Sequence, residues 1–497
     1  MMKLTDATIR ISVRNIVEFI MKSGDLDNSF TRRDPDAMQE GSRLHRKIQK
    51  RMGPEYQAEV ALSITIPVKR DGSEFDLVIE GRADGIIKSV EENQTRVTID
   101  EIKCIFAPLQ QITEMIPVHR AQAMCYAYIY ASQEQLTHIA IQLTYCQMES
   151  ETIKQFEEDF TIEQLESWFQ VLTTEYCKWA SWQVNWRQYR NQSIKQIEFP
   201  FEYRPGQKDL VTGVYRTIIR DKKLFIEAPT GVGKTISTVF PTVKAMGEGF
   251  LSKIFYLTAK TITRTVAEDT FQLMSDKGVR MKVVTITAKD KICILDKPNC
   301  NPTSCPRAKG HFDRVNDAVY DLMINETRIS RELIEEYANK HEVCPFEMGL
   351  DVTNWSDAII CDYNYVFDPN VYLRRFFSEE KKQEYAFLID EAHNLVDRSR
   401  EMYSAVLVKQ DFLEAKKVIK DKSKALTKRI DACNEVMLRY KRDCEDCKVL
   451  NEVGDLVIPL LRLMTEFEEF NKEFGDFEGR DVLTQLYFDV KHFLASE

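Results

Sequence analysis

Two stretches of this sequence carry side chains suited to binding and hydrolysing a nucleoside triphosphate. The first, residues 228–235, follows the apolar run Leu224-Phe225-Ile226, which is expected to be a strand, and precedes a helical pattern; a phosphate-binding loop needs this strand–loop–helix context. Its two glycines would let the backbone curl so that N–H groups face phosphate oxygens, beside the positive end of a helix dipole. Lys234 would reach the β- and γ-phosphates, and the Thr235 hydroxyl would bind Mg²⁺. The predicted ATP-binding residues here are Ala228, in place of the usual first glycine, Pro229, Thr230, Gly231, Val232, Gly233, Lys234 and Thr235.

The second stretch, Ala386–His393, is an apolar run that ends in two neighbouring carboxylates. A continuous apolar run predicts a parallel strand that is buried on both faces. Asp390 would hold Mg²⁺ directly or through water, Glu391 would orient and deprotonate the attacking water, and His393 is assigned to the same ATP site. The alternative is an acidic loop after a core strand, which the phosphate-binding loop in the same chain disfavours.

With both stretches, the chain resembles the superfamily 2 helicases that carry an Asp-Glu-Ala-His box. Residues 201–208 resemble the segment that recognises adenine in these helicases. The resemblance implies that Gln207 presents both amide functions to the edge of adenine, while Tyr203 and Arg204 pack on the ring. A polar turn before a helix is the alternative reading.

A buried strand is predicted over Ile254–Lys260, and its polar end resembles the helicase segment that touches single-stranded DNA. Small hydroxyl side chains run from Thr258 to Thr265, with Lys260 and Arg264 among them. Cations here suit phosphate contacts, which give affinity without sequence preference. Lys260 and Arg264 are therefore predicted to bind DNA, although a capped helix start would have the same composition.

Four cysteines lie between the phosphate loop and the acidic box. They are Cys293, Cys300, Cys305 and Cys344. Four thiolates would bind Zn²⁺ or an iron–sulfur cluster. Their placement, with Ala288–Cys293 and Ala358–Pro369, resembles the XPD/DinG-type iron–sulfur helicases. The resemblance favours a 4Fe–4S cluster over zinc and over four unrelated thiols.

The first 190 residues have the pattern of a separate mixed α/β domain. Helical spacing occurs over Ile9–Met21, and turns are predicted at Asp71-Gly72 and Glu80-Gly81 between strands. Residues 191–201 have the composition of a linker to the part that binds nucleotide. We therefore expect this domain to have candidate site residues of its own.

An ordered set of polar residues in this domain resembles the PD-(D/E)xK nucleases of the RecB-like branch. In chain order the set is His45, Asp84, Glu101, Lys103, Gln122 and Tyr126. The resemblance implies that His45, Asp84 and Glu101 hold a divalent ion that activates water, with Glu59 as a weaker candidate. Lys103 would stabilise the charge that builds on phosphorus. Taken singly, each residue would more often be an ordinary surface charge.

Bulk composition bounds the compartment and the partners. The formal charge of −10 neither indicates nor excludes nucleic-acid binding, because binding depends on a local basic surface. No apolar run has the length of a membrane span, and the first residues lack the apolar core of a signal peptide, so a cytoplasmic protein is expected without membrane contact. Twelve cysteines in such a compartment suggest metal chemistry or buried thiols.

These patterns predict an α/β chain: a mixed α/β nuclease-like domain, then a RecA-like parallel-sheet ATPase domain with an inserted iron–sulfur lobe and a helical arch. The predicted segments are 1–190 (nuclease-like), 191–285 (ATPase, first part), 286–350 (iron–sulfur insertion), 351–405 (ATPase, second part) and 406–497 (arch).

The resemblance implies an ATP-dependent DNA helicase that translocates 5′ to 3′ in repair. ATP, Mg²⁺ and a 4Fe–4S cluster are the implied cofactors, and single-stranded DNA and junctions the implied partners. No second RecA-like domain follows in the sequence, so slow ATP turnover by this chain alone is expected. Two alternatives stay open: a DNA-tethering module with an inactive nuclease domain and weak ATPase, and a metabolic or signalling ATPase with structural zinc.

Overall fold

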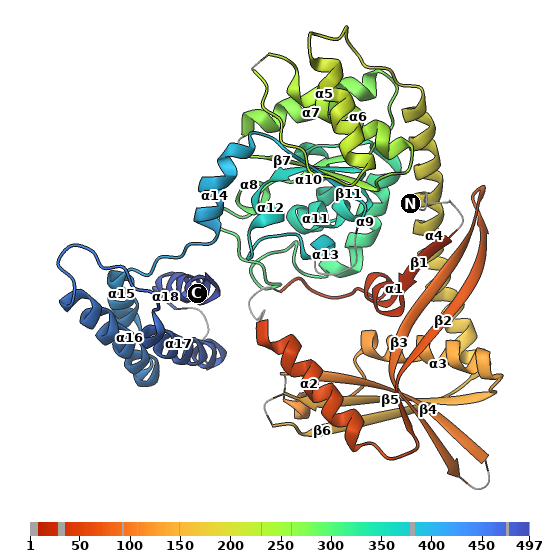
Figure 1. Ribbon diagram of the computed structural model, residues 1–497. Coiled ribbons are helices and arrows are strands. Elements are labelled where there is room, and N and C mark those ends of the chain that lie inside the picture. The colour runs from red at the N-terminus through yellow and green to blue at the C-terminus, as the bar shows by residue number, and fades with distance from the viewer. Residues whose placement is uncertain are drawn as a thin grey trace. The chain divides into compact units, whose positions relative to one another are not determined.

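The computed structural model describes residues 8–27, 35–91, 94–106, 108–148, 150–229, 231–259, 261–377, 383–473 and 477–496. The chain divides into two units, drawn in Figure 1. The first comprises Met1–Tyr256, Thr261–Cys361 and Gln383–Leu388, and the second Leu257–Lys260, Asp362–Lys382 and Ile389–Glu497. Within the described part of the chain, every helix is too short or too polar to cross a bilayer.

A six-stranded mixed sheet organises the N-terminal part of the first unit. Its strand order is β1-β3-β4-β5-β6, with β2 paired to β3. The elements are β1 (Thr8–Ser12), α1 (Val13–Ile20), α2 (Pro35–Arg51), β2 (Tyr56–Arg70), β3 (Ser73–Glu91), β4 (Gln94–Ile105), η1 (Leu109–Gln111), α3 (Pro117–Glu134), β5 (His138–Gln147), β6 (Ile153–Thr161) and α4 (Ile162–Lys195). Helices α1, α3 and α4 cover one hydrophobic core with the strands.

Two local expectations for this domain were wrong. The stretch Ile9–Met21 is not one helix, because β1 pairs parallel to β3 and the helix begins only after Ser12. Ser12 Oγ accepts a hydrogen bond from Asn15 N at 3.1 Å, which is an N-cap that starts α1 there. Glu80-Gly81 is not a turn either: β3 continues through it, and a Cβ on Gly81 would lie 2.6 Å from Tyr126 Oη. The glycine therefore serves a close approach of α3 to the sheet.

A five-stranded sheet with the order β11-β7-β10-β8-β9 organises the ATPase part. Strands β8 and β10 are parallel, as are β8 and β9, and all six residues of β7 are buried as predicted. The elements are α5 (Gln207–Ile219), α6 (Lys234–Gly247), β7 (Lys253–Thr258), α7 (Thr261–Asp276), β8 (Val283–Thr285), α8 (Lys289–Ile292), α9 (His311–Asn325), β9 (Arg328–Ile329), α10 (Arg331–Lys340), α11 (Pro345–Trp355), β10 (Ala358–Asp362) and β11 (Tyr385–Ile389).

Two apolar runs differ from the buried strands predicted for them. Leu224-Phe225-Ile226 forms no strand, and Phe225 is 91% exposed. Strand β11 does form, but it lies at the end of the sheet order, and Phe387 on it is 41% exposed. An edge strand has a neighbour on one side only, so one of its edges stays without ladder hydrogen bonds.

Helix α4 (Ile162–Lys195) runs through residues 191–195 of the stretch expected to be a linker, and only residues 196–201 lie outside helices and strands. Its N-terminal half contributes Leu165 and Phe169 to the core of the N-terminal domain, while Ile194 near its end lies in the core of the ATPase part. Trp179 on the same helix packs on Phe19 and Trp355 at centroid distances of 5.1 and 4.5 Å. The two parts of the first unit are therefore joined by the shared helix α4, drawn in Figure 1, and by aromatic packing.

The second unit is mainly helical, as predicted for residues 406–497. Its elements are α12 (Asn364–Phe367), α13 (Arg374–Phe377), η2 (Ala392–Asn394), α14 (Leu395–Met402), α15 (Lys409–Ile419), α16 (Lys424–Arg442), α17 (Gly454–Glu473) and α18 (Arg480–Ser496). Helices α15 to α18 bury one hydrophobic core of their own, which includes Phe412 and Phe467.

Candidate functional site

The N-terminal sheet brings several of the predicted nuclease residues together. Strands β3 and β4 pair antiparallel with Gly85 opposite Asp100, so Asp84 and Glu101 are neighbours across the ladder. His45 is supplied by α2. Ligand atoms of His45, Glu59 and Asp84 all lie within 4.8 Å of one another, which is close enough to share one cation. Glu59, the weaker candidate in the sequence, is thus inside the cluster.

His45 is held in an orientation that suits a metal ligand. Its Nε2 lies 2.7 Å from the carbonyl oxygen of Ile102 and donates a hydrogen bond to it. That bond leaves the lone pair on Nδ1, which lies 3.7 Å from Asp84 Oδ1. A backbone acceptor on one ring nitrogen is the usual device that fixes the tautomer of a metal-binding histidine.

Glu101, the third predicted ligand, is not in this group of three, although its charge raises the pKa of Asp84. Lys103 Nζ donates to Glu101 Oε1 and to Gln122 Oε1, each at 2.7 Å. The other oxygen, Glu101 Oε2, is buried without a hydrogen-bond partner. A buried carboxylate oxygen without a partner costs free energy, and a divalent cation would supply the missing interaction. The residues present therefore fit a divalent ion.

Burial raises the pKa of both carboxyl groups when no metal is bound. Burial, and then the charge of Glu101, raises the pKa of Asp84 to about 8, although the backbone N–H of Ile102 opposes this shift at 2.7 Å. Burial also raises the pKa of Glu101, against the effect of Lys103. Two such carboxyls at one place are characteristic of a cation site or an acid–base pair.

The metal-free protein is expected to lose thermal stability as the pH rises from about 5 to about 8. Folded Asp84 keeps its proton to about pH 8, whereas in the unfolded chain it ionises near pH 4. The folded chain then binds more protons over this interval, so stability falls with increasing pH.

Thermal melts in a chelator should record a fall of about 5 °C or more. Asp84→Asn should flatten the profile, and saturating Mg²⁺ or Mn²⁺ should reverse the fall. A melting temperature that does not change with pH in the metal-free wild type would contradict the assignment.

Glu59 reaches the cluster through an unusual backbone conformation. Its φ is +56° within β2, in the left-handed region that non-glycine residues seldom adopt. Gln49 Nε2 donates to Glu59 Oε1 at 2.9 Å and to the carbonyl oxygen of Asp84 at 3.0 Å, which ties the two acidic residues to α2. Strained residues of this kind concentrate at functional sites, and no periodicity in the sequence reveals them.

Asp100, which directly precedes Glu101 on β4, is another buried carboxylate, and it was not predicted from the sequence. Asp100 is fully buried and accepts hydrogen bonds from Thr144 Oγ1 at 2.6 Å, Gln142 Nε2 at 3.0 Å and Tyr56 Oη at 3.1 Å. The Tyr56 ring lies where a Cβ on Gly85 would be. This network holds β4 against β5 next to Glu101.

The described residues of the predicted phosphate-binding loop have the backbone that its glycines indicated. Gly231 and Gly233 have φ of +85° and +78°, and Gly233 caps α6, which begins with Lys234 and Thr235. The helix N-terminus therefore starts at the two residues assigned to phosphate and Mg²⁺. Val232 and Lys234 are half-buried, and Pro229 is exposed. Thr230 lies outside the described residues.

Gln207 does not offer its amide to a ligand here. It is buried, its Nε2 donates to the carbonyl oxygen of Val232 at 2.9 Å, and its Oε1 accepts from Arg204 N at 3.0 Å. Gln207 therefore links the segment before α5 to the phosphate loop. Arg204 is exposed, and Tyr203 stacks on Phe199 at 4.4 Å.

The acidic box lies in the second unit, directly after β11. Asp390 N donates to the carbonyl oxygen of Leu257 at 3.0 Å, and Tyr363 Oη donates to the carbonyl oxygens of Asp390 and Glu391. Glu391 has a φ of +49°, and its Oε2 lies 3.4 Å from His393 Nδ1. These three hydrogen bonds hold the backbone where β11 ends. They help to keep Glu391 in a left-handed conformation that residues other than glycine seldom adopt.

The four predicted cluster cysteines line one small cavity. Cys305 and Cys344 are buried, while Cys293 and Cys300 are partly exposed. Burial raises the pKa of Cys344 to about 11, and Cys344 N donates to His311 Nδ1 at 3.2 Å. Lys289 lies beside Cys300. A buried thiol without a cation stays protonated, whereas a bound metal would hold four thiolates, so this donor set fits an iron–sulfur cluster or zinc.

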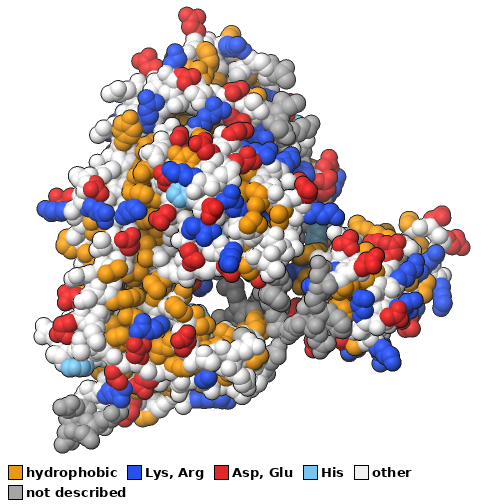
Figure 2. Space-filling model, turned by 180° about the vertical axis from the view of Figure 1, so that it is seen from behind, with side chains coloured by type: hydrophobic (Ala, Val, Ile, Leu, Met, Phe, Trp, Pro, Cys, Tyr) orange, Lys and Arg blue, Asp and Glu red, His pale blue; other side chains and the backbone are white. Residues whose placement is uncertain are grey.

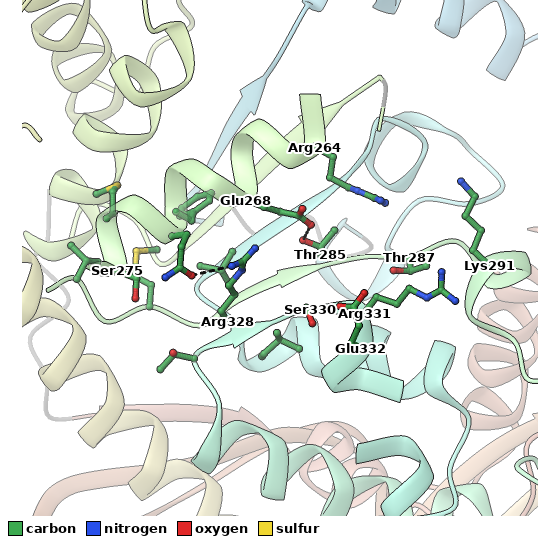
Figure 3. A pocket seen from close by; sticks show the side chains of 18 residues that line it. Arg264, Glu268, Ser275, Thr285, Thr287, Lys291, Arg328, Ser330, Arg331 and Glu332 are labelled. Atoms are coloured by element: carbon green, nitrogen blue, oxygen red, sulfur yellow. Dashed lines mark hydrogen bonds between the residues drawn. The ribbon is translucent and has the colours of Figure 1, made fainter. Parts of the chain in front are cut away.

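A polar pocket surrounds Arg264, one of the two predicted DNA-binding residues (Figure 3). Arg264 from α7, Lys291 from α8 and Arg331 from α10 point toward the space beside Thr287. Arg264 Nε is buried without a hydrogen-bond partner, whereas Arg331 Nε contacts Glu335 at 2.7 Å. Sequence reasoning missed Lys291 and Arg331, because they are far from Arg264 along the chain. Lys260, the other predicted contact, lies outside the described residues.

The local charge of the pocket contrasts with the mixed charge on the face shown in Figure 2. On the face shown in Figure 2, acidic and basic side chains are interspersed with hydrophobic ones. In the pocket itself, Glu268 accepts a hydrogen bond from Thr285 Oγ1 at 2.7 Å, which leaves the neighbouring cations to face the opening. Converging cations and hydroxyls are typical of a phosphate-binding surface.

Comparison with known proteins points to one class of enzyme. The DEAD_2 family matches residues 257–412, a stretch that contains the four cysteines, the Arg264 pocket and the acidic box. This stretch of the chain is therefore similar to that family.

Curated relatives are similar over part of the chain. Regulator of telomere elongation helicase 1 of Rattus norvegicus is 21% identical over 277 residues, which cover 45% of this chain and 21% of that protein. Its homolog in Caenorhabditis elegans is 22% identical over 338 residues, covering 58% and 34%. The general transcription and DNA repair factor IIH helicase subunit XPD of Dictyostelium discoideum is 20% identical over 226 residues, covering 40% and 29%. The chain thus spans about a third or less of these relatives.

Two solved structures are also similar, "XPD_Helicase" and "Truncated XPD". Each has a TM-score of 0.37, with 17% and 16% identity, and they cover 59% and 58% of this chain and 51% and 81% of those chains. The part of the chain that these matches cover is thus similar to the DEAD_2 family and to helicases of the two names given above.

Proposed function

We propose that this chain acts as an ATP-driven DNA helicase of the XPD type that translocates 5′ to 3′ on single-stranded DNA in DNA repair. The observation that carries the proposal is the DEAD_2 match over residues 257–412, which includes the cysteine cavity and the acidic box in one uninterrupted stretch. Hydrolysis of ATP in a metabolic enzyme does not require four cysteines around one cavity or a pocket of cationic side chains, so these two features favour the helicase.

Each part of the motor has a proposed role. Lys234 would contact the β- and γ-phosphates and Thr235 would bind Mg²⁺, since both begin α6 after two left-handed glycines. Asp390 would bind Mg²⁺, and Glu391 would position the attacking water. An iron–sulfur cluster would tie together the cysteine-bearing segments that line the cavity.

We further propose that the N-terminal domain is a metal-dependent DNA nuclease of the PD-(D/E)xK type. The supporting observations are that ligand atoms of His45, Glu59 and Asp84 lie within 4.8 Å of one another, and that a buried oxygen of Glu101 has no hydrogen-bond partner. The cation would polarise the scissile phosphate and activate water, and Lys103 would stabilise the charge that develops on phosphorus. The alternative is that this domain only tethers the motor to DNA.

The Arg264 pocket gives a direct test of DNA binding. Arg264→Glu combined with Arg331→Glu should weaken binding of a labelled oligothymidylate by about tenfold or more, because two phosphate contacts become repulsions. Fluorescence anisotropy at several salt concentrations should also record a shallower salt dependence. The matched control is Arg462→Glu, an exposed charge on α17 outside the pocket. Equal losses in the control and the double variant would sink the assignment.

A further inference from the structure

A segment of the N-terminal domain forms one wall of the cysteine cavity. Leu26 lines that cavity together with Cys305 and Cys344, and it is only 5% exposed. It packs in the same hydrophobic cluster as both cysteines and Ala308. Leu26 is almost 280 residues from Cys305 along the chain, so this contact is a docking of one domain on another within the first unit.

Backbone hydrogen bonds fasten this segment at several points. Leu26 N donates to the carbonyl oxygen of Ala308 at 2.8 Å, and Phe312 N donates to the carbonyl oxygen of Gly24 at 3.0 Å. Two aspartates add bonds in opposite directions. Asp313 Oδ1 accepts from Gly24 N at 2.8 Å, and Asp25 Oδ1 accepts from Gly310 N at 2.6 Å.

Charge and aromatic contacts extend the docking beyond Leu26. Lys22 Nζ lies 2.7 Å from Asp351 Oδ2, with both side chains largely buried, and 4.8 Å from the ring centroid of Phe312. Asn316 Nδ2 donates to the carbonyl oxygen of Phe19 at 2.7 Å. Such a set of directed contacts fixes the register of the segment, whereas an incidental surface contact would lack it.

We propose that residues 22–27, here called the cover segment, shield the cysteine cavity, so that docking of the N-terminal domain controls how readily its metal group is lost. The proposal rests on the cysteine site of the proposed function. Leu26 excludes water from the two buried thiol positions, and loss of a thiolate-bound metal requires entry of water, acid or a competing ligand. The N-terminal domain thus acts as a positioning element for a site to which it gives no ligand.

Thiol labelling tests the cover segment without the need for a bound metal. In metal-free, reduced, native protein, Leu26→Asp should increase the rate of iodoacetamide labelling of Cys305 and Cys344 by about tenfold, because burial now protects both. Cys125 and Cys433, each fully buried in another core, are internal controls and should stay unlabelled. The matched control is Ser23→Asp, which adds the same charge at an exposed position of the segment.

A second measurement follows the metal itself. Iron or zinc release to a chelator from loaded protein should be about five- to tenfold faster in Leu26→Asp than in the wild type or Ser23→Asp. Leu26→Ala, which removes bulk without charge, should give the same pattern more weakly and keeps the test decisive if the aspartate unfolds the lobe. Unchanged labelling of Cys305 and Cys344 in both Leu26 variants would overturn the proposal. If the wild type binds no metal but the Leu26 variants are labelled faster, the result would support the cover segment and contradict only the proposed metal site.

Discussion

Asp84→Ala is expected to abolish metal-dependent DNA cleavage by the N-terminal domain. Asp84 supplies one oxygen to the cluster with His45 and Glu59 and accepts from Ile102 N through the other. Removing this ligand would forfeit several kcal/mol of stabilisation by the metal, which corresponds to a loss of cleavage on the order of 10³-fold. Asp84→Asn should be nearly as inactive, because the amide keeps the shape and loses the charge.

The measurement is cleavage of a labelled single strand in Mn²⁺ or Mg²⁺. Asp76→Ala is the matched control, because Asp76 is an exposed aspartate on the same strand, β3, outside the cluster. This control should cut like the wild type. Wild-type protein that binds the ion and DNA but does not cut would support the tethering alternative. Cleavage that survives in Asp84→Ala would show that the nuclease assignment is wrong.

Lys234→Ala should weaken Mg·ATP binding and lower DNA-stimulated ATP hydrolysis by about 100-fold or more, since one preorganised cation on the transferring phosphoryl group is lost. Lys234 begins α6 directly after Gly233, where the N-terminus of the helix adds to the attraction for phosphate. A fluorescent ATP analogue should be titrated alongside the hydrolysis assay, so that nucleotide binding is measured separately from turnover.

Lys223→Ala is the control for this experiment. Lys223 is an exposed lysine shortly before the loop and carries the same charge. It should bind and hydrolyse ATP like the wild type. If Lys223→Ala and Lys234→Ala behave alike, the loop at residues 228–235 does not bind the nucleotide.

Backbone conformation was the most predictable part of these sites. Gly231 and Gly233 are followed by a lysine at a helix start, and both have positive φ, as such a loop requires. The buried strand β7 and the helical segment after residue 406 also follow directly from apolar periodicity. Such local conformations depend on residues that are close together in the chain, so they can be predicted from the sequence.

Side-chain partnerships were less predictable, because they depend on residues far apart in the chain. Gln207 was expected to face adenine, but its amide is bonded to Val232 and Arg204. Glu59 joins the group with His45 and Asp84 through a left-handed φ, which the spacing of residues in a sequence does not predict. Leu224-Phe225-Ile226 has the composition of a buried strand, yet composition does not show whether a neighbouring strand is present to pair with it.

The four-cysteine site offers the most direct test of the whole account, because it separates a nucleic-acid motor of the iron–sulfur type from an ATPase with structural zinc. The measurement is iron, sulfide and zinc content, with a visible spectrum, of the protein purified without oxygen. The account predicts a brown protein with about four iron and four sulfide per chain, all lost in Cys305→Ser. A colourless protein that holds one zinc, or no metal at these cysteines, would contradict it.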